Sequence, residues 1–212
     1  PRAAGRRRRV VAVVEVLDGP AAVARALRGK TFRVAAAGFW QVHPAALETL
    51  AAAVLDAVEP RAGDTVVELY AGAGALSAVL ADTVGSGGRV LGLEGDRQAV
   101  ADAAANLAAW PWARVQHGRV DAAAIAALDV AADIVVLDPP RAGAGRAVIT
   151  AVAALRPRAI GYVSCDPATL ARDVAALRAL GWRLRALRAF DAFPMTHHVE
   201  CLATLVPLRS AS

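Results

Sequence analysis

A cysteine stands where an apolar run meets a helical pattern, in the segment "YVSCDPATLARDV" from Tyr162 to Val174. Cys165 is one of only two cysteines in the chain. Asp166 and Pro167 follow it directly, and these residue types favour the cap and the first turn of a helix. Because a helix amino-terminus stabilises anions, we expect it to lower the pKa of Cys165 and favour the thiolate. Cys165 is therefore a candidate nucleophile, and the alternative is a small buried hydrophobic residue.

A carboxylate at an unusual place is the second chemical signal. In "FPMTHHVECL", Glu200 stands between Val199 and Cys201, where a loop enters the last apolar run. Burying a charge there is costly unless it has a use, so Glu200 is a candidate general base. Cys201 is interpreted as a core residue. His197 and His198 lack the spacing of metal ligands, and we expect no metal site.

A glycine-rich turn in "VVELYAGAGALSAVLA" indicates a cofactor loop between a strand and a helix. Gly72 and Gly74 allow a sharp turn and close approach of a ligand to a helix amino-terminus. About 20 residues on, Glu94 ends the next strand, where a carboxylate can hold a ribose diol. Ser77 replaces the third glycine of the dinucleotide fingerprint, and Glu68 precedes the turn. These two residues favour S-adenosylmethionine over a nicotinamide dinucleotide, while a turn shaped by glycine alone is the structural alternative.

The segment "DIVVLDPPRAG" places Asp138 at a strand end before two prolines, which make the loop rigid. Methyltransferases that act on amino nitrogens carry a similar Asp-Pro-Pro followed by an aromatic residue. Arg141 occupies that fourth position here and can grip a phosphate or a carbonyl edge instead. The segment therefore argues against methylation of an amino group.

A thiolate beside a methyl donor suits methylation of carbon 5 of a pyrimidine. Carbon 5 is a poor nucleophile until a group adds to carbon 6. Addition of Cys165 there gives an enolate whose carbon 5 can attack the methyl group. A base must then remove the proton from carbon 5 so that the cysteine can leave, and Glu200 is the candidate.

The elements that must position these residues alternate between strand and helix patterns. Continuous apolar strands separated by helices indicate a parallel sheet covered on both faces. The last two expected strands follow one another directly, which predicts an antiparallel hairpin. We therefore predict an α/β fold with a doubly wound, mostly parallel, seven-stranded Rossmann-like sheet, with ligands at the carboxyl ends of the strands. The expected strands are "TVVELY", "RVLGLE", "ARVQH", "DIVVLD", "AIGYVS", "WRLRALRAF" and "VECLATLVPL".

The amino-terminal part predicts a small β appendage. Short strands are expected at 10–16 and 31–35, near the turn signals "LDGP" and "RGK". A helix is expected in "HPAALETLAAAVLDAVEP", with Pro44 in its first turn and Pro60 ending it. We expect residues 1–36 to be the remnant of a preceding β region and residues 37–212 to be the catalytic domain.

The composition limits the partners and the compartment. A net charge of +5, carried almost wholly by arginine, weakly favours a polyanionic partner. The run Arg6–Arg9 could grip phosphates, although a solvated tail is the favoured interpretation. No run approaches the roughly 18 apolar residues of a membrane span, and no secretory signal is evident. Two distant cysteines favour a reducing cytoplasm. We also expect a monomer.

In their order and spacing, "LDPPRAG", "SCDPATLARD" and "FPMTHHVE" resemble the signature of the RNA 5-methyluridine methyltransferases that act on tRNA and ribosomal RNA. "GFWQVHPAALETL" resembles the segment leading into their catalytic domain, and the likeness extends from Lys30 to the end of the chain. The resemblance implies an S-adenosylmethionine-dependent enzyme with an RNA substrate. By it, Cys165 is the nucleophile and Glu200 the general base. The positions that contact the cofactor in the family fall on Gln41, Tyr70, Glu94 and Asp138.

The chain departs from the family pattern at several places. His43 and Ala75 stand where relatives often have asparagine, and Arg119 replaces an asparagine or acidic residue near the cofactor. Full-length relatives typically add an amino-terminal RNA-binding TRAM domain and often cysteines for an iron–sulfur cluster, which this sequence does not contain. Two alternatives therefore remain, namely a relative that binds RNA or cofactor without turnover and an NAD-dependent oxidoreductase.

Overall fold

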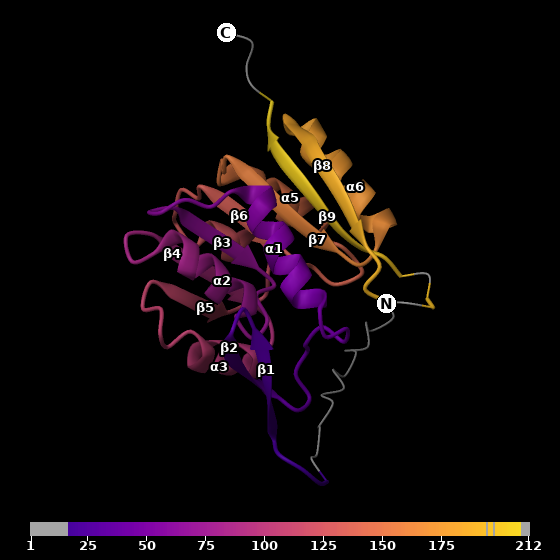
Figure 1. Ribbon diagram of the computed structural model, residues 1–212. Helices are drawn as coiled ribbons and strands as arrows, with labels where there is room; N and C mark the ends of the chain where they lie inside the picture. The colour runs from indigo at the N-terminus through magenta and orange to yellow at the C-terminus, as the bar shows by residue number, and fades with distance from the viewer. Residues whose placement is uncertain (1–16, 194, 197, 209–212) are drawn as a thin grey trace, which may run out of the picture.

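A seven-stranded sheet forms the centre of the molecule, with helices on both sides and a small hairpin beside it (Figure 1). The computed structural model describes residues 17–193, 195–196 and 198–208. The strands are β1 (Ala22–Leu27), β2 (Lys30–Ala35), β3 (Thr65–Leu69), β4 (Arg89–Glu94), β5 (Ala113–His117), β6 (Ile134–Leu137), β7 (Ala159–Ser164), β8 (Trp182–Phe190) and β9 (Glu200–Pro207). The helices are α1 (Ala46–Val58), α2 (Ala75–Val84), α3 (Arg97–Asn106), α4 (Ala122–Ala126), α5 (Gly145–Ala154) and α6 (Pro167–Ala179).

The strand order confirms the predicted fold class. The sheet runs β5-β4-β3-β6-β7-β9-β8, and its first five strands are parallel. β9 pairs antiparallel with both β7 and β8, so the carboxyl-terminal hairpin closes one side of the sheet. All seven strands expected from apolar runs form within one residue of the expected bounds. The parallel strands end together, which places the residues that follow them along one edge.

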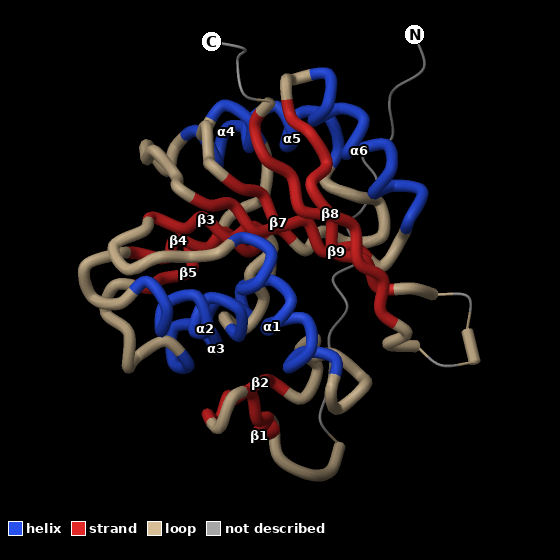
Figure 2. The backbone as a smooth tube through the Cα atoms, turned by 45° about the horizontal axis from the view of Figure 1, so that its top comes forward, coloured by secondary structure: helices blue, strands red, loops and turns tan. Residues whose placement is uncertain are grey.

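Both faces of the sheet are buried, which explains why its central strands are apolar without alternation. In β3, Val66 packs in one core with α1, α2 and α3, whereas Val67 packs in the other with α4, α5 and α6. Figure 2 shows these two helical layers on opposite sides of the strands. The sheet is therefore a rigid platform from which the loops at its carboxyl edge project.

The hairpin β1–β2 is a separate antiparallel sheet that packs against α3. Leu27 and Phe32 of the hairpin join the same core as α1 and α2. The expected strand at 31–35 is confirmed with one added residue, but β1 was not expected, because half of its side chains are exposed and its residues give no apolar pattern. The strand expected at 10–16 and the run Arg6–Arg9 lie outside the described residues.

The first helix begins later than predicted. α1 starts at Ala46, so Pro44 lies before the helix rather than in its first turn. His43 accepts a hydrogen bond at Nδ1 from the Ala45 backbone N–H at 3.2 Å. The histidine thus bonds a backbone group at the helix start, a task that an asparagine side chain also performs. The helix ends at Val58, two residues before Pro60, as predicted.

No described helix is long and apolar enough to cross a membrane. The division between residues 1–36 and 37–212 stays a prediction. The hairpin packs against α3 and the main core. This packing is expected, because the hairpin is too small to form a core of its own.

Candidate functional site

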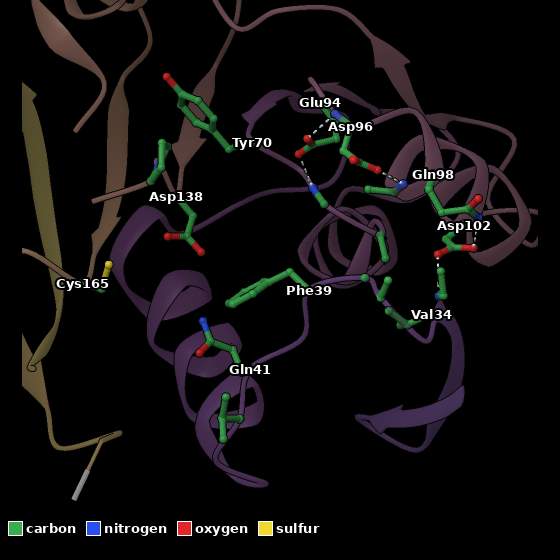
Figure 3. Close-up of a pocket in the computed structure, with 18 of the residues that line it drawn as sticks. Val34, Phe39, Gln41, Tyr70, Glu94, Asp96, Gln98, Asp102, Asp138 and Cys165 are labelled. Carbon is green, nitrogen blue, oxygen red and sulfur yellow. Dashed lines mark hydrogen bonds between the residues drawn. The ribbon is translucent and has the colours of Figure 1, made fainter. Parts of the chain in front are cut away.

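A pocket of about 1130 Å³ opens at the carboxyl edge of the parallel strands. Residues directly after β3, β6 and β7 and at the end of β4 contribute to its wall, and the connector from β2 to α1 closes another side (Figure 3). Gly74 is the one predicted site residue not among the described residues that line it. The seven that do are Gln41, Tyr70, Gly72, Glu94, Asp138, Cys165 and Glu200.

The glycine loop turns sharply between β3 and α2, as its sequence predicts. Gly72 and Gly74 have φ values of 54° and 80°, in the left-handed region that glycine adopts without strain. Gly74 caps α2, and an added Cβ would lie 3.2 Å from the Ala103 side chain of α3. Gly74 therefore serves the close packing of the loop on α3, while Gly72 faces the pocket.

A buried carboxyl group supports this loop from below. Glu68 of β3 accepts a hydrogen bond from the hydroxyl of Ser77 on α2. Burial raises the pKa of Glu68 to about 8, and the nearby carboxylates of Asp138 and Glu94 add to the shift. Ser77, which departs from the dinucleotide fingerprint, is thus the buried partner of Glu68 and joins strand to helix.

Glu94 is held rigidly at the end of β4. Its Oε2 accepts the Gly72 backbone N–H at 2.9 Å, and its Oε1 accepts the Asp96 backbone N–H at 2.8 Å. Each carboxylate oxygen can accept a further hydrogen bond, so both can receive hydroxyl groups of a ligand. This geometry suits the binding of a ribose diol.

Tyr70 and Asp138 line the pocket, and Figure 3 shows Asp138 on the side of the pocket toward Cys165. Tyr70 has a φ of 64°, a strained conformation for a bulky residue and one that often occurs at functional sites. Asp138 follows β6, and burial raises its pKa to about 6. Gln41 enters from the opposite wall, on the connector that leads to α1.

The pairing of β7 with β9 brings Cys165 and Glu200 together. Ser164 at the end of β7 pairs with Cys201 of β9. The next position along this antiparallel ladder has Cys165 on one side and Glu200 on the other. Residues 35 apart in sequence therefore reach the same end of the pocket because β9 returns beside β7.

Glu200 is buried without a hydrogen-bond partner for one of its oxygens. The residue is 2% exposed, and Oε1 has no partner among the described groups. Burial and the neighbouring carboxylate of Asp138 raise the pKa of Glu200 to about 7. An unsatisfied buried carboxyl costs stability, so its retention beside a pocket points to a chemical use.

The expected lowering of the Cys165 pKa is wrong. Asp166 caps α6 by accepting the Thr169 N–H at 2.8 Å, and Pro167 starts the helix, as predicted. Burial nevertheless raises the pKa of the Cys165 thiol, and the charges of Glu200 and Asp138 raise it further. Burial and these two carboxyl groups, which come from β9 and from the loop after β6, outweigh the backbone hydrogen bond and the Arg141 charge that lower the pKa of Cys165.

Several further residues of the pocket were not among the predicted site residues, although three of them lie in sequence segments quoted above. Phe39 is 75% exposed on the connector, although its ring lines the pocket, and Phe193 and His198 line it from the loop before β9. Asp102 of α3 accepts the Ala35 backbone N–H at 2.7 Å and so holds the end of β2. The phenylalanines and His198 could have been suspected from those quoted segments, whereas the partners of Asp102 lie far away in sequence.

The structure also shows where Arg119 and Cys201 lie. Arg119 is exposed and is not among the described residues that line the pocket. Cys201 is buried in the core, as interpreted from the sequence. No group of three His, Cys, Asp or Glu residues that could hold a metal occurs within the described ranges.

The sheet order and glycine loop define a Rossmann-like methyltransferase fold. The chain belongs to the tRNA (uracil-5-)-methyltransferase family, whose sequence model matches residues 6–207. A protein of Streptomyces avermitilis described as an uncharacterized RNA methyltransferase is 49% identical over 191 residues, which are 90% of this chain and 44% of that protein. A Streptomyces coelicolor protein with the same description is 49% identical over 178 residues, 84% of this chain and 39% of that protein.

A solved structure has the same fold over most of this chain. The crystal structure of Pyrococcus abyssi tRNA (uracil-54, C5)-methyltransferase in complex with S-adenosyl-L-homocysteine matches with a TM-score of 0.73 and 28% identity. The match covers 89% of this chain and 45% of that chain. The present chain therefore spans less than half of the length of each of these three relatives.

Proposed function

We propose that this chain carries the catalytic region of an S-adenosylmethionine-dependent enzyme that methylates carbon 5 of a uridine in tRNA or ribosomal RNA. The observation that carries the proposal is the meeting of Cys165 with the buried, incompletely bonded Glu200 in the pocket that Glu94 and the glycine loop also line. The membership of the family supports the same reaction class.

The residues at the β4 side of the pocket fit the methyl donor. Glu94 is oriented by two backbone N–H groups and would accept hydrogen bonds from ribose hydroxyls. Gly72 has open space where a side chain would stand, so the donor can approach the backbone. Gln41, Tyr70 and Asp138 would contact the part of the donor that extends toward Cys165. When bound, S-adenosylmethionine supplies a methyl group on a positively charged sulfur.

Cys165 begins the reaction by adding its sulfur to carbon 6 of the uracil. The electrons of the C5–C6 double bond move onto the oxygen at carbon 4, which gives an enolate. Carbon 5 then forms a bond to the methyl carbon as the bond from that carbon to the donor sulfur breaks, releasing S-adenosylhomocysteine. The uracil must leave the RNA stack to bring carbon 6 to the thiolate.

Glu200 completes the reaction as the general base. Its carboxylate takes the proton from carbon 5, the C5–C6 double bond re-forms, and the C6–S bond breaks to return the Cys165 thiolate. A pKa of about 7 lets Glu200 be deprotonated in a useful fraction at neutral pH and still be basic enough to accept the proton.

The two earlier alternatives differ in their support. The family match removes the main reason for considering a nicotinamide enzyme, and such an enzyme would leave Cys165 and Glu200 without a use. A relative that binds donor or RNA without turnover remains the rival proposal. Its motivation is that Arg119 replaces a residue expected near the donor and that the chain spans less than half of its relatives.

Methyl transfer can be tested with S-adenosylmethionine labelled in its methyl group and with separate tRNA and ribosomal RNA pools that lack 5-methyluridine. We expect labelled 5-methyluridine in the digest of at least one pool by mass spectrometry. Cys165→Ala should abolish it, and Cys201→Ala serves as the matched control that should retain it. Donor binding by calorimetry without any labelled nucleoside would instead support the non-catalytic relative.

A further inference from the structure

The loop after β6 is fastened to α6 by a set of hydrogen bonds that centres on one buried carboxylate. Asp173 is 1% exposed, and its Oδ2 accepts the backbone N–H groups of Ala144 and Gly145 at 2.8 and 3.2 Å. The same oxygen accepts the Tyr162 hydroxyl of β7 at 2.8 Å. Arg172 pairs with Oδ1 at 3.0 Å. We call these three side chains, Tyr162, Arg172 and Asp173, the α6 clamp.

Further contacts hold the part of this loop that precedes Ala144. Arg172 donates to the Ala142 carbonyl at 2.9 Å, and Thr169 donates through its hydroxyl to the Arg141 carbonyl at 3.0 Å. Gly143 has a φ of 75°, and an added Cβ would lie 2.7 Å from Asp173 Oδ2. The glycine thus allows the loop backbone to lie directly on the carboxylate.

The loop held in this way carries Arg141 at the Cys165 end of the pocket. Arg141 and Cys165 both line it, and the Arg141 carbonyl is bonded to the first turn of the helix that follows Cys165. Its guanidinium lies 3.3 Å from Nε2 of His198, on the segment that leads to Glu200. Because a guanidinium only donates, Arg141 is the donor in this contact and the ring nitrogen of His198 accepts.

Charged groups on several elements shift the pKa of the Cys165 thiol in opposite directions. Burial raises the pKa of Cys165, and Glu200 of β9 and Asp138 after β6 raise it further. The Arg141 guanidinium acts against them and lowers the pKa. The charge of Arg141 also lowers the pKa of Asp166, which caps α6 next to Cys165. Among the described side chains, Arg141 is the cation that lowers the pKa of the Cys165 thiol.

We propose that Asp173 is a positioning residue that, through the α6 clamp, holds Arg141 where its guanidinium stabilises the Cys165 thiolate. This inference rests on the proposed function for the use of the thiolate, and it assigns the clamp a part in activating the nucleophile. Arg141 neutralises carboxylate charge beside Cys165 before and after the C6–S bond exists.

The test measures the rate at which iodoacetamide alkylates Cys165 in the full chain between pH 6 and 10. Trypsin releases Cys165 in the peptide 159–172 and Cys201 in a different one, so mass spectrometry follows each thiol separately. The midpoint is the pH at which alkylation of Cys165 reaches half of its maximal rate. We expect Arg141→Gln to move this midpoint up by about 0.5 to 1 pH unit and to slow alkylation at pH 7 about three- to tenfold. Arg141→Lys should keep most of the wild-type profile because it keeps the charge.

Asp173→Asn should shift the midpoint in the same direction as Arg141→Gln, and adding Arg141→Gln to it should shift the midpoint little further. Asp64→Asn is the matched control, because it breaks another arginine–carboxylate pair, Arg158–Asp64, at the opposite end of the sheet. The control should lower stability and leave the Cys165 profile unchanged.

The inference is overturned if Arg141→Gln leaves the alkylation midpoint where it is in the wild type. Arg141 is exposed, so this variant is expected to fold even where Asp173→Asn does not. A shifted midpoint in a chain that forms no 5-methyluridine would support the inference and count only against the proposed function. If the wild type methylates RNA but the alkylation midpoint of Arg141→Gln is unchanged, the proposed function is supported and this inference is overturned.

Discussion

At the scale of single residues, the site gathers carboxyl groups around one thiol. Asp138, with a pKa of about 6, and Glu200, with a pKa of about 7, both act on Cys165. Each of the three groups disfavours charge on the others, because they share a poorly solvated space. Asp138 and Glu200 can therefore each gain or lose a proton near neutral pH, which suits a reaction that needs a base.

Glu200 should reduce the stability of the protein at alkaline pH. Its pKa is raised from 4.5 to about 7 in the folded chain, so the folded state binds more protons than the unfolded state between these values. Stability is then highest below pH 4.5 for this group and falls as the pH rises through 7. We predict that Glu200→Gln raises the free energy of unfolding at pH 8 by on the order of 3 kcal/mol.

The measurement is urea unfolding of wild type and Glu200→Gln at pH 5 and pH 8. The difference between the two proteins should be small at pH 5 and large at pH 8. Equal differences at pH 5 and pH 8 would show that the pKa of Glu200 is not raised in the folded chain. The same variant should lose methyl transfer, so gain of stability and loss of activity would come from one atom exchange.

At the scale of elements, the hairpin β1–β2 forms one wall of the pocket and is joined to the glycine loop by Asn106. The Asn106 amide donates to the carbonyls of Arg33 and Ala73 at 2.9 Å each, and its Oδ1 accepts the Arg33 N–H at 2.8 Å. Ala73 lies in the glycine loop and lines the pocket. One side chain of α3 thus fixes two pocket walls relative to each other.

We predict that Asn106→Ala weakens binding of S-adenosylhomocysteine about fivefold or more and lowers the free energy of unfolding by about 1 to 3 kcal/mol. The loss follows because backbone groups of both walls lose their partner. Calorimetric titration measures the affinity. The matched control is Lys30→Gln, which removes the exposed Lys30–Asp82 ion pair of the same hairpin and should change binding little. Unchanged binding in Asn106→Ala would mean that the hairpin does not shape the donor site.

The elements also show what the sequence could and could not reveal. The central strands β3, β6 and β7 were predictable because they are buried on both faces and read as continuous apolar runs. β1 was missed because only Leu27 at its end is fully buried. The predicted start of α1 was two residues early, since Pro44 suits both a first turn and the loop before it.

The same distinction holds for the site. Local motifs located Cys165, Glu200, Glu94 and Asp138 because each stands beside the end of a strand. The direction of the Cys165 pKa shift was missed because it depends on burial and on carboxyl groups from β9 and the loop after β6, which no local pattern reveals. The bonds of Asp102, Asn106 and Asp173 were hidden for the same reason, because they join segments that are distant along the chain.

At the scale of the whole molecule, the net charge of +5 bears on the proposed RNA substrate. Arginine side chains that contact phosphates release bound counterions, so affinity should fall steeply with salt. We predict that RNA binding weakens at least about tenfold between 50 and 200 mM salt. Filter binding at several salt concentrations measures the slope, and S-adenosylhomocysteine binding serves as the salt-insensitive control. A flat slope would contradict an RNA contact made through the backbone.

The most direct test of the proposed mechanism is to trap the covalent intermediate. The chain is incubated with S-adenosylmethionine and RNA containing 5-fluorouridine, in which carbon 5 carries no proton for Glu200 to remove. We predict a methylated RNA–protein adduct on denaturing gels of the wild type, located at Cys165 by mass spectrometry and absent in Cys165→Ala. An adduct that persists in Cys165→Ala, or 5-methyluridine formed by a chain that gives no adduct, would contradict nucleophilic catalysis by Cys165.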